Sequence, residues 1–149
     1  MPTLAINRKA HHEYEITERF EAGIKLTGPE VKSVKLGRMD LSGSYAHITA
    51  HGQVLLTNAA IAPYPPAVHD QKNYIQHRDR ELLLHRKEIA SLIGKSRTHG
   101  YTLIPLSVYS KSGLIKIELG LGRGKKKYDK REAIKKREFE RKKHQLLSR

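Results

Sequence analysis

Residues 101–121 read YTLIPLSVYSKSGLIKIELGL, and this stretch decides the fold. Apolar residues dominate two segments, 101–109 and 114–121, and the polar residues 110–113 separate them. Apolar runs rich in β-branched and aromatic side chains, bounded by a glycine-containing turn, are typical of paired strands. The stretch therefore predicts a β-hairpin.

Further short strands are expected upstream. Residues 12–20 alternate large and charged side chains with a period of two, which predicts a half-buried strand, and residues 22–26 continue as an extended segment. Residues 44–50 and 53–57 are two apolar-rich runs joined by His51-Gly52, a pattern that predicts a second hairpin.

Two short helices interrupt these strands. Residues 28–37 predict a helix with proline in its first turn and Gly37 at its end. Residues 86–93 predict another, followed by Gly94. The polar residues 70–80 are expected to form a surface loop.

The element order predicts a mainly β fold, because no strand–helix–strand alternation is present. Our first choice is an antiparallel β-barrel of the oligonucleotide-binding (OB) kind with a few short helices, and a generic β-sandwich is the alternative. We expect residues 1–122 to form the barrel. Residues 123–149 then form a basic C-terminal tail, disordered or marginally helical when free and helical when bound.

The charge is concentrated at the end of the chain. Residues 123–149 hold 13 Lys and Arg against 4 Asp and Glu, a net charge of +9 out of +14 for the whole sequence. This asymmetry indicates a polyanionic partner, with RNA or DNA as the leading candidate. Without cysteine, no disulfide or Cys-based zinc site can form. No apolar run has membrane-spanning length, so we expect a cytoplasmic protein without a membrane partner. We also expect a monomer.

The tail has the features of a helix that needs a partner. Asp129 and Glu132 match a capping box, and Glu132 and Lys136 form a favourable i,i+4 pair. The tail's apolar residues make no continuous stripe, so the helix should be marginal alone. Tyr128 lies among lysines, where a core is not expected, and stacking on a base suits it best.

The sequence indicates no catalytic, metal or cofactor site. His47 and His51 are four residues apart, but on a strand this spacing separates them by roughly 13 Å. The glycine-rich residues 120–124 lack the Lys-Ser/Thr of a phosphate-binding loop, and we interpret them as a flexible hinge.

A basic and partly aromatic surface remains as the candidate site. Residues spaced to meet phosphates are Asn7, Arg8, Lys9, Arg78, Arg80, Arg86, Lys87, Lys95 and Arg97. Tyrosines that could stack on bases are Tyr14, Tyr64, Tyr74 and Tyr128, although a core or half-core position is the favoured interpretation for each of the first three.

Together these segments resemble the SmpB (SsrA-binding protein) family. The motifs that carry the resemblance are NRKA at 7–10, EAGI at 21–24, EVKS at 30–33, RELLLH at 80–85 and RGKKKYDKRE at 123–132. They follow in this order along nearly the whole chain.

The resemblance implies an OB barrel that binds the tRNA-like domain of transfer-messenger RNA (tmRNA, or SsrA). Such a protein mimics the anticodon arm and delivers tmRNA to stalled ribosomes for trans-translation, so that the nascent peptide is tagged for degradation. Its tail senses the empty mRNA channel at the decoding centre. No enzymatic activity is implied.

The resemblance also implies site residues by position. Those expected on the tRNA-like domain are Glu21, Leu83, His85, Arg123, Gly124, Lys125 and Lys126. Those expected at the decoding centre are Tyr128, Asp129, Lys130 and Arg131. Leu83 could make an apolar contact with RNA or pack in the core.

Three positions depart from the family pattern. Residues 77–81 form a shorter loop without the usual proline, and Tyr128 stands where many members have His, which removes a charge that could form near neutral pH. Gly122 replaces a common Ala and is expected to loosen the hinge.

The alternative is an OB-fold ribosomal protein bound permanently to rRNA through its tail. A translation-initiation type of factor ranks third and an RNA-modifying enzyme fourth. A resident ribosomal protein would sediment with ribosomes at a fixed ratio, whereas a tmRNA partner would be substoichiometric and would co-purify with one structured RNA.

Overall fold

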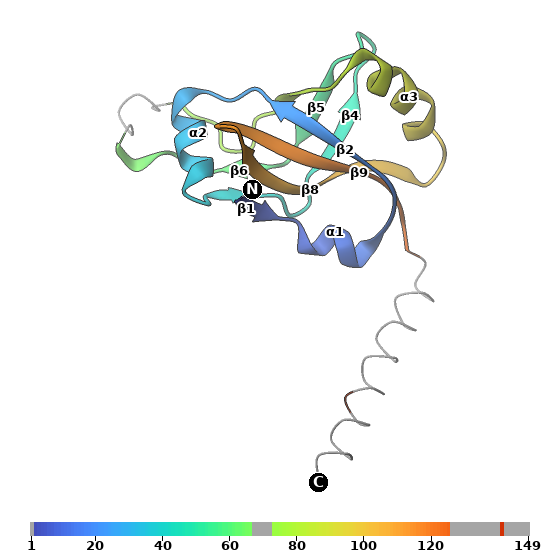
Figure 1. The fold of residues 1–149 in the computed structure, drawn as a ribbon, viewed down its shortest axis with the longest axis horizontal. Coiled ribbons are helices and arrows are strands. Elements are labelled where there is room, and N and C mark those ends of the chain that lie inside the picture. Colours follow the sequence, from blue (N-terminus) through green and yellow to red (C-terminus); the bar gives the residue numbers. More distant parts are fainter. Residues whose placement is uncertain (1, 67–72, 126–140, 142–149) are drawn as a thin grey trace.

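Figure 1 shows the computed structural model of the chain, which describes residues 2–66, 73–125 and 141. In chain order the elements are β1 (Thr3–Ile6), α1 (Arg8–Glu13), β2 (Tyr14–Ile24), α2 (Gly28–Lys35), β3 (Met39–Asp40), β4 (Tyr45–Ile48), β5 (Val54–Thr57), β6 (Ala60–Ile61), β7 (Arg80–Leu83), α3 (Arg86–Ser96), β8 (Tyr101–Lys111) and β9 (Leu114–Gly124). The expectation of a mainly β fold with a few short helices is confirmed.

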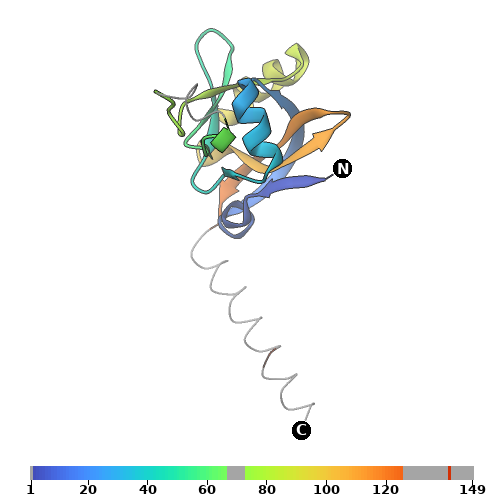
Figure 2. The same cartoon turned by 90° about the vertical axis from the view of Figure 1, so that its left-hand side faces the viewer.

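Six strands pair in a closed ring. Their order is β8-β4-β5-β7-β2-β9, and β9 pairs again with β8. Every pairing in the ring is antiparallel. β1 is added along a different part of β8, and β3 pairs with β6 in a separate two-stranded sheet. Figures 1 and 2 show the three helices on different sides of this barrel.

Both predicted hairpins are present. β8 and β9 pair from Lys111↔Leu114 to Tyr101↔Arg123. Ser112 and Gly113 connect them with φ values of 52° and 78°. Two successive residues with positive φ suit a tight hairpin, because that turn matches the right-handed twist of the strands. The predicted strand at 12–20 and the extended segment at 22–26 join in the single strand β2, which pairs with β9 over most of its length. The predicted start is wrong, because residues 12 and 13 belong to α1, and β2 ends at Ile24.

The helix predictions are confirmed in position and partly in length. Thr27 caps α2 through the backbone N–H of Glu30, and the Glu30 carboxylate accepts from the backbone N–H of Thr27. α3 continues to Ser96, so the end predicted at Gly94 is wrong. A glycine inside a helix costs only about 1 kcal/mol, and the buried Leu92 holds the second half of the helix on the core.

The interpretation of residues 120–124 as a hinge is wrong, because β9 continues to Gly124. A Cβ at Gly120 would lie 2.9 Å from Cδ1 of Leu106, and one at Gly122 would lie 2.9 Å from Cδ1 of Ile16. These glycines therefore permit close packing rather than flexibility, and the expected loosening by Gly122 is also wrong. The predicted boundary between barrel and tail after residue 122 stays a prediction. β9 ends two residues beyond it, at Gly124.

A buried ion pair ties α2 to the start of β7. The side chains of Glu30 and Arg80 are 1% and 0% exposed, and Nη2 of Arg80 lies 2.7 Å from Oε2 of Glu30. Arg80 also donates to the backbone oxygens of Ala59, Gln76 and Arg78. The prediction that Arg80 meets phosphates is therefore wrong.

Two neighbours complete this buried cluster. Arg78 forms a second ion pair with Glu30. The Tyr74 hydroxyl lies 2.9 Å from both Oε2 of Glu30 and the carbonyl oxygen of Ile61 and can donate its proton to either, so Tyr74 is a structural residue rather than a stacking platform. Burial alone would raise the pKa of Glu30, but hydrogen bonds from Arg78, the Thr27 backbone and Arg80 outweigh it and lower the pKa to about 2.

Replacing Arg80 by alanine should lower the free energy of unfolding by about 3–5 kcal/mol, because the Glu30 carboxylate would stay buried without its main partner. Denaturant unfolding at pH 7 measures this. Lys95→Ala is the matched control: its ion pair with Glu18 is exposed and should contribute at most about 1 kcal/mol. Equal losses in the two variants would contradict the prediction.

The same cluster should make stability depend on pH. The folded-state pKa of Glu30 lies below the ordinary value of 4.5, so its contribution is complete above about pH 4.5 and is lost as the pH falls toward 2. Glu30→Gln should flatten this part of the stability profile.

Candidate nucleic-acid interface

The described residues expected to contact RNA form two groups. Glu21, Leu83 and His85 lie where β2 meets β7, because Gly23 pairs with Leu83. Arg123–Lys125 lie at the other end of β2, where Tyr14 pairs with Gly124. Tyr14 and Glu21 are seven positions apart on an extended strand, or roughly 23 Å at about 3.3 Å per residue. A ligand that touches both groups must follow β2.

Glu21 is held in place by residues from the β8–β9 hairpin. The hydroxyl of Tyr109 donates to Oε2 of Glu21, and Nζ of Lys111 lies 3.3 Å from Oε1. The Tyr109 hydrogen bond lowers the pKa of Glu21, and the cations of Lys111 and Lys116 lower it further. Glu21 is exposed and stays ionised at neutral pH, so it can accept hydrogen bonds from base amino groups or ribose hydroxyls.

Leu83 is on the surface. Its side chain is 48% exposed, whereas Leu82 beside it is buried, as the alternation of a strand requires. The alternative that Leu83 packs in the core is therefore wrong. A Cβ on Gly23 would lie 3.4 Å from Cβ of Leu83, so the two strands approach closely here. An exposed leucine beside a fixed carboxylate offers apolar contact next to a hydrogen-bond acceptor.

His85 begins α3 at its N-cap position. Its backbone N–H donates to Oε1 of Glu88 at 3.3 Å, and its side chain is exposed. Arg86 and Lys87 follow and are also exposed. Leu83 is therefore followed closely in the chain by an exposed ring and two cations. The ring could contact a base and the cations could contact phosphates.

The second group, Arg123–Lys125, is bonded to α1 and the start of β2 at the point where the basic tail begins. Arg123 forms an ion pair with Glu15 at 3.0 Å. The backbone N–H of Lys125 donates to the carbonyl of Glu13 at 2.8 Å, and its Nζ lies 3.4 Å from the carbonyl of His11. Lys125 is thereby attached to α1. The other tail residues expected in the site, Lys126, Tyr128, Asp129, Lys130 and Arg131, lie outside the described residues.

Not every basic residue is available to a phosphate. Lys95 pairs with Glu18 at 2.7 Å, and Arg78 pairs with Glu30. Asn7 is buried, where its side chain donates to the carbonyl of Pro105 and accepts from the backbone of Ala10. The predicted cations that are exposed, with no ion pair to a carboxylate of the described residues, are Arg8, Lys9, Arg86, Lys87 and Arg97.

Sequence reasoning missed the residues that hold Glu21. Tyr109 and Lys116 are opposite one another on β8 and β9, and Lys111 is at the hairpin end. The sequence does contain a pattern that identifies Lys116 as an outward-facing residue. Lys116 and Glu118 interrupt an apolar run with a period of two, which marks the outer face of β9. The carboxylate that these side chains face depends on the register between β2 and β9. That register is set by the pairing of segments far apart in the sequence.

Residues 2–66, 73–125 and 141 lack the features of two other kinds of site. No group of three or more His, Asp or Glu is placed to hold a metal ion. No helix in this part of the chain is long and apolar enough to cross a membrane.

The fold and this surface define a small basic β-barrel protein with the kind of outer face that RNA-binding proteins use. The family model described as SmpB protein matches residues 4–149, and the chain belongs to the SmpB family.

Known relatives agree with this assignment. An SsrA-binding protein from Geobacillus kaustophilus is 50% identical over 141 residues, covering 93% of this chain and 87% of that protein. One from Caldicellulosiruptor bescii is 52% identical over 137 residues, covering 92% and 85%. A solved structure described as "tmRNA-SmpB: a journey to the center of the bacterial ribosome" matches with a TM-score of 0.68 and 42% identity, over 90% of this chain and 95% of that one.

Replacing Tyr109 by phenylalanine should raise the pKa of Glu21, because the hydroxyl that stabilises the ionised carboxylate is removed. NMR titration of the glutamate side-chain carboxyl carbons measures this. Glu81, which pairs with Lys25, is the internal control and should titrate as before. An unchanged pKa for Glu21 would contradict the positioning role of Tyr109.

Proposed function

We propose that this protein binds the tRNA-like domain of tmRNA and delivers it to stalled ribosomes for trans-translation. One observation carries the proposal: the chain matches a tmRNA-SmpB structure at 42% identity over 90% of its length. Relatives near 50% identity are SsrA-binding proteins. The protein then acts as an RNA adaptor in the cytoplasm, where ribosomes work, and not as an enzyme.

The barrel supplies the RNA-holding part of this function. Glu21, Leu83 and His85 contact the tRNA-like domain from the β2–β7 junction. Glu21 accepts hydrogen bonds, Leu83 contributes apolar contact, and His85 contributes a ring or a donor. Arg123 and Gly124 extend this contact along β2, and Lys125 and Lys126 neutralise phosphates at the start of the tail. In this position the barrel replaces the missing anticodon arm of tmRNA.

The tail from residue 123 onward supplies the sensing part. Tyr128 stacks on an exposed base at the decoding centre, and Asp129, Lys130 and Arg131 contact rRNA there. The rest of the tail enters the empty mRNA channel and becomes helical against it. Tyr128 keeps the stacking face of a histidine but acts without a positive charge.

Sequencing of co-purified RNA tests the proposal. The tagged full-length protein should recover one abundant structured RNA, tmRNA, and should associate with ribosomes at a substoichiometric ratio. Recovery of rRNA alone, at a fixed ratio to ribosomes, would instead support the permanently bound ribosomal protein. Leu83→Ala should reduce recovery of tmRNA, whereas Leu36→Ala, at a more exposed leucine that caps the end of α2, should not.

Replacing Asp129, Lys130 and Arg131 by alanines should abolish peptide tagging on stalled ribosomes while leaving affinity for the tRNA-like domain within about twofold. The reason is that we assign sensing to the tail motif and RNA holding to the barrel. Tagging in a reconstituted translation system and binding by fluorescence anisotropy measure the two effects. A large loss of affinity in this variant would contradict the division.

A further inference from the structure

The short helix α1 lies between the barrel and the point where the basic tail begins. The carbonyl of Glu13, its last residue, accepts from the backbone N–H of Lys125 at 2.8 Å, one position beyond the end of β9. Nζ of Lys125 also lies 3.4 Å from the carbonyl of His11. The orientation of α1 therefore directs the first residue that follows the barrel.

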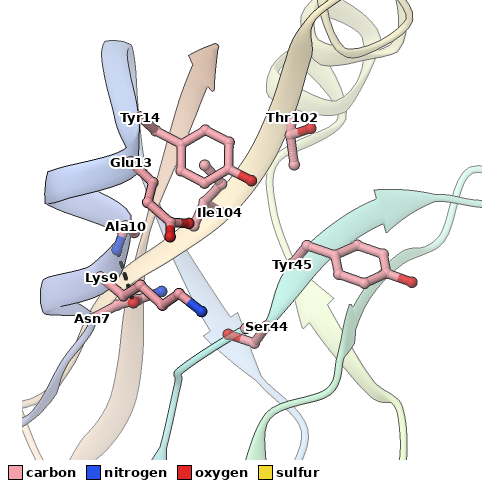
Figure 3. Close-up of a pocket in the computed structure, with 10 residues that line it drawn as sticks. Asn7, Lys9, Ala10, Glu13, Tyr14, Ser44, Tyr45, Thr102 and Ile104 are labelled. Carbon is pink, nitrogen blue, oxygen red and sulfur yellow. Dashed lines mark hydrogen bonds between the residues drawn. The ribbon is translucent and has the colours of Figure 1, made fainter. Parts of the chain in front are cut away.

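α1 cannot hold this orientation by itself. Isolated helices shorter than roughly 12 residues are marginal in water, and α1 has six. A cavity of about 280 Å³ lies beside it, with Ala10 and Glu13 on the side of α1 and Ser44 and Tyr45 on the other side (Figure 3). Side chains of β4 therefore do not support α1 across this cavity.

Asn7 supplies the attachment to the barrel. Its backbone N–H donates to the carbonyl of Leu106 at 2.8 Å, and its Nδ2 donates to the carbonyl of Pro105 at 2.9 Å. Its Oδ1 accepts from the backbone N–H of Ala10 at 3.2 Å, the hydrogen bond drawn in Figure 3. Asn7 is 3% exposed, so water does not compete for these bonds. One residue thus caps α1 and ties its first turn to β8.

The backbone of β8 is irregular at the point where Asn7 binds. The register of β8 against β9 shifts between Pro105 and Ser107, which leaves Leu106 as the extra residue of a bulge. A bulge disrupts the strand ladder locally and changes the direction of the groups around it. The two carbonyls that Asn7 binds are at this bulge, and Ala10 packs with Leu106. The bulge in β8 therefore fixes where α1 begins.

These contacts connect the bulge in β8 to the tail through Asn7, α1 and the carbonyl of Glu13. Asp129 is four positions after Lys125, so its Cα lies within roughly 14 Å of that of Lys125 even in a fully extended chain. A tethered motif reaches its target at an effective concentration that depends on the geometry of the tether. The direction in which the chain leaves Lys125 therefore affects how often the motif meets its site.

We propose that Asn7 is a positioning residue for the tail: through α1, it fixes the direction in which the chain leaves the barrel after Lys125. Asn7 is buried and does not touch RNA. It acts on the step at which the tail motif engages the ribosome, after tmRNA is bound. This step rests on the proposed function, whereas the control of Lys125 by Asn7 does not.

Asn7→Asp in the full-length protein separates the two contacts of the side chain. Aspartate still accepts from the backbone N–H of Ala10 and keeps the cap, but it has no amide to donate to Pro105. The amide of Lys125 should then exchange with solvent about tenfold faster, because its acceptor on α1 is no longer held. Hydrogen exchange followed by NMR measures this, and the amide of Ile117, in the middle of β9, reports global opening.

The same variant should separate rate from affinity. The maximal rate of peptide tagging, at a saturating concentration of the complex with tmRNA, should fall about tenfold, while affinity for the tRNA-like domain stays within about twofold. A reconstituted translation system measures the rate, and fluorescence anisotropy measures the affinity. A purely structural loss would lower the folded fraction and reduce both quantities together, so a change in rate alone identifies a positioning role.

Lys125→Pro and Lys125→Ala form a matched pair at the other end of α1. Both variants lose the lysine cation, but only proline also loses the N–H that binds Glu13. The two should bind the tRNA-like domain equally, and Lys125→Pro should tag more slowly than Lys125→Ala. Neither changes a core residue, so this pair decides the question if thermal unfolding shows that Asn7→Asp does not fold.

The outcomes distinguish this proposal from the proposed function. Equal tagging by Lys125→Pro and Lys125→Ala would overturn the positioning role. So would a folded Asn7→Asp in which Lys125 exchanges as in the parent, or in which tagging and affinity fall equally. If the unaltered protein neither binds the tRNA-like domain nor supports tagging, the proposed function fails. Faster exchange at Lys125 alone, in Asn7→Asp, would still support the control of Lys125 by Asn7.

Discussion

The ion pair between Glu30 and Arg80 is the constraint on which the arrangement of the RNA-facing surface depends. Arg80 is the first residue of β7, and its guanidinium bonds to Glu30 on α2 and to carbonyls from the segments around Ala59 and Gln76. One buried cation thus joins a helix, a turn and a loop to a strand. Leu83 and His85 follow within five residues, so their position depends on this cluster.

The cluster also explains how the shortened segment at residues 77–81 is accommodated. Arg78 and Arg80 both turn toward Glu30, and Tyr74 joins them through its hydroxyl. The sequence predicts a basic, RNA-facing loop at residues 77–81. In the structure, contacts with Glu30 hold this segment against α2. Arg86 and Lys87, at the start of α3, are exposed cations on this side without an ion pair to a carboxylate of the described residues.

The closed ring of strands has one continuously paired side and one sparsely paired seam. Long pairings of β2 and β8 with β9 make one side continuous, and that side carries the fixed carboxylate of Glu21. The single bridge between β4 and β8 leaves a seam on the other side, where Tyr45 is exposed.

The sequence by itself determined the local elements and the character of the partner. The β8–β9 hairpin, α2 and the basic tail follow from alternation, capping residues and charge, all of which act between near neighbours. Tertiary structure alone decided that Arg80 is buried, that Gly120 and Gly122 pack tightly, and that Tyr109 holds Glu21. These outcomes depend on strand register and on partners more than 10 residues away. Composition and the spacing of residues along the sequence do not reveal such long-range contacts. The six-residue helix α1 was missed for the same reason, because its buried Ala10 packs under β8 and the helix is too short to show a period of its own.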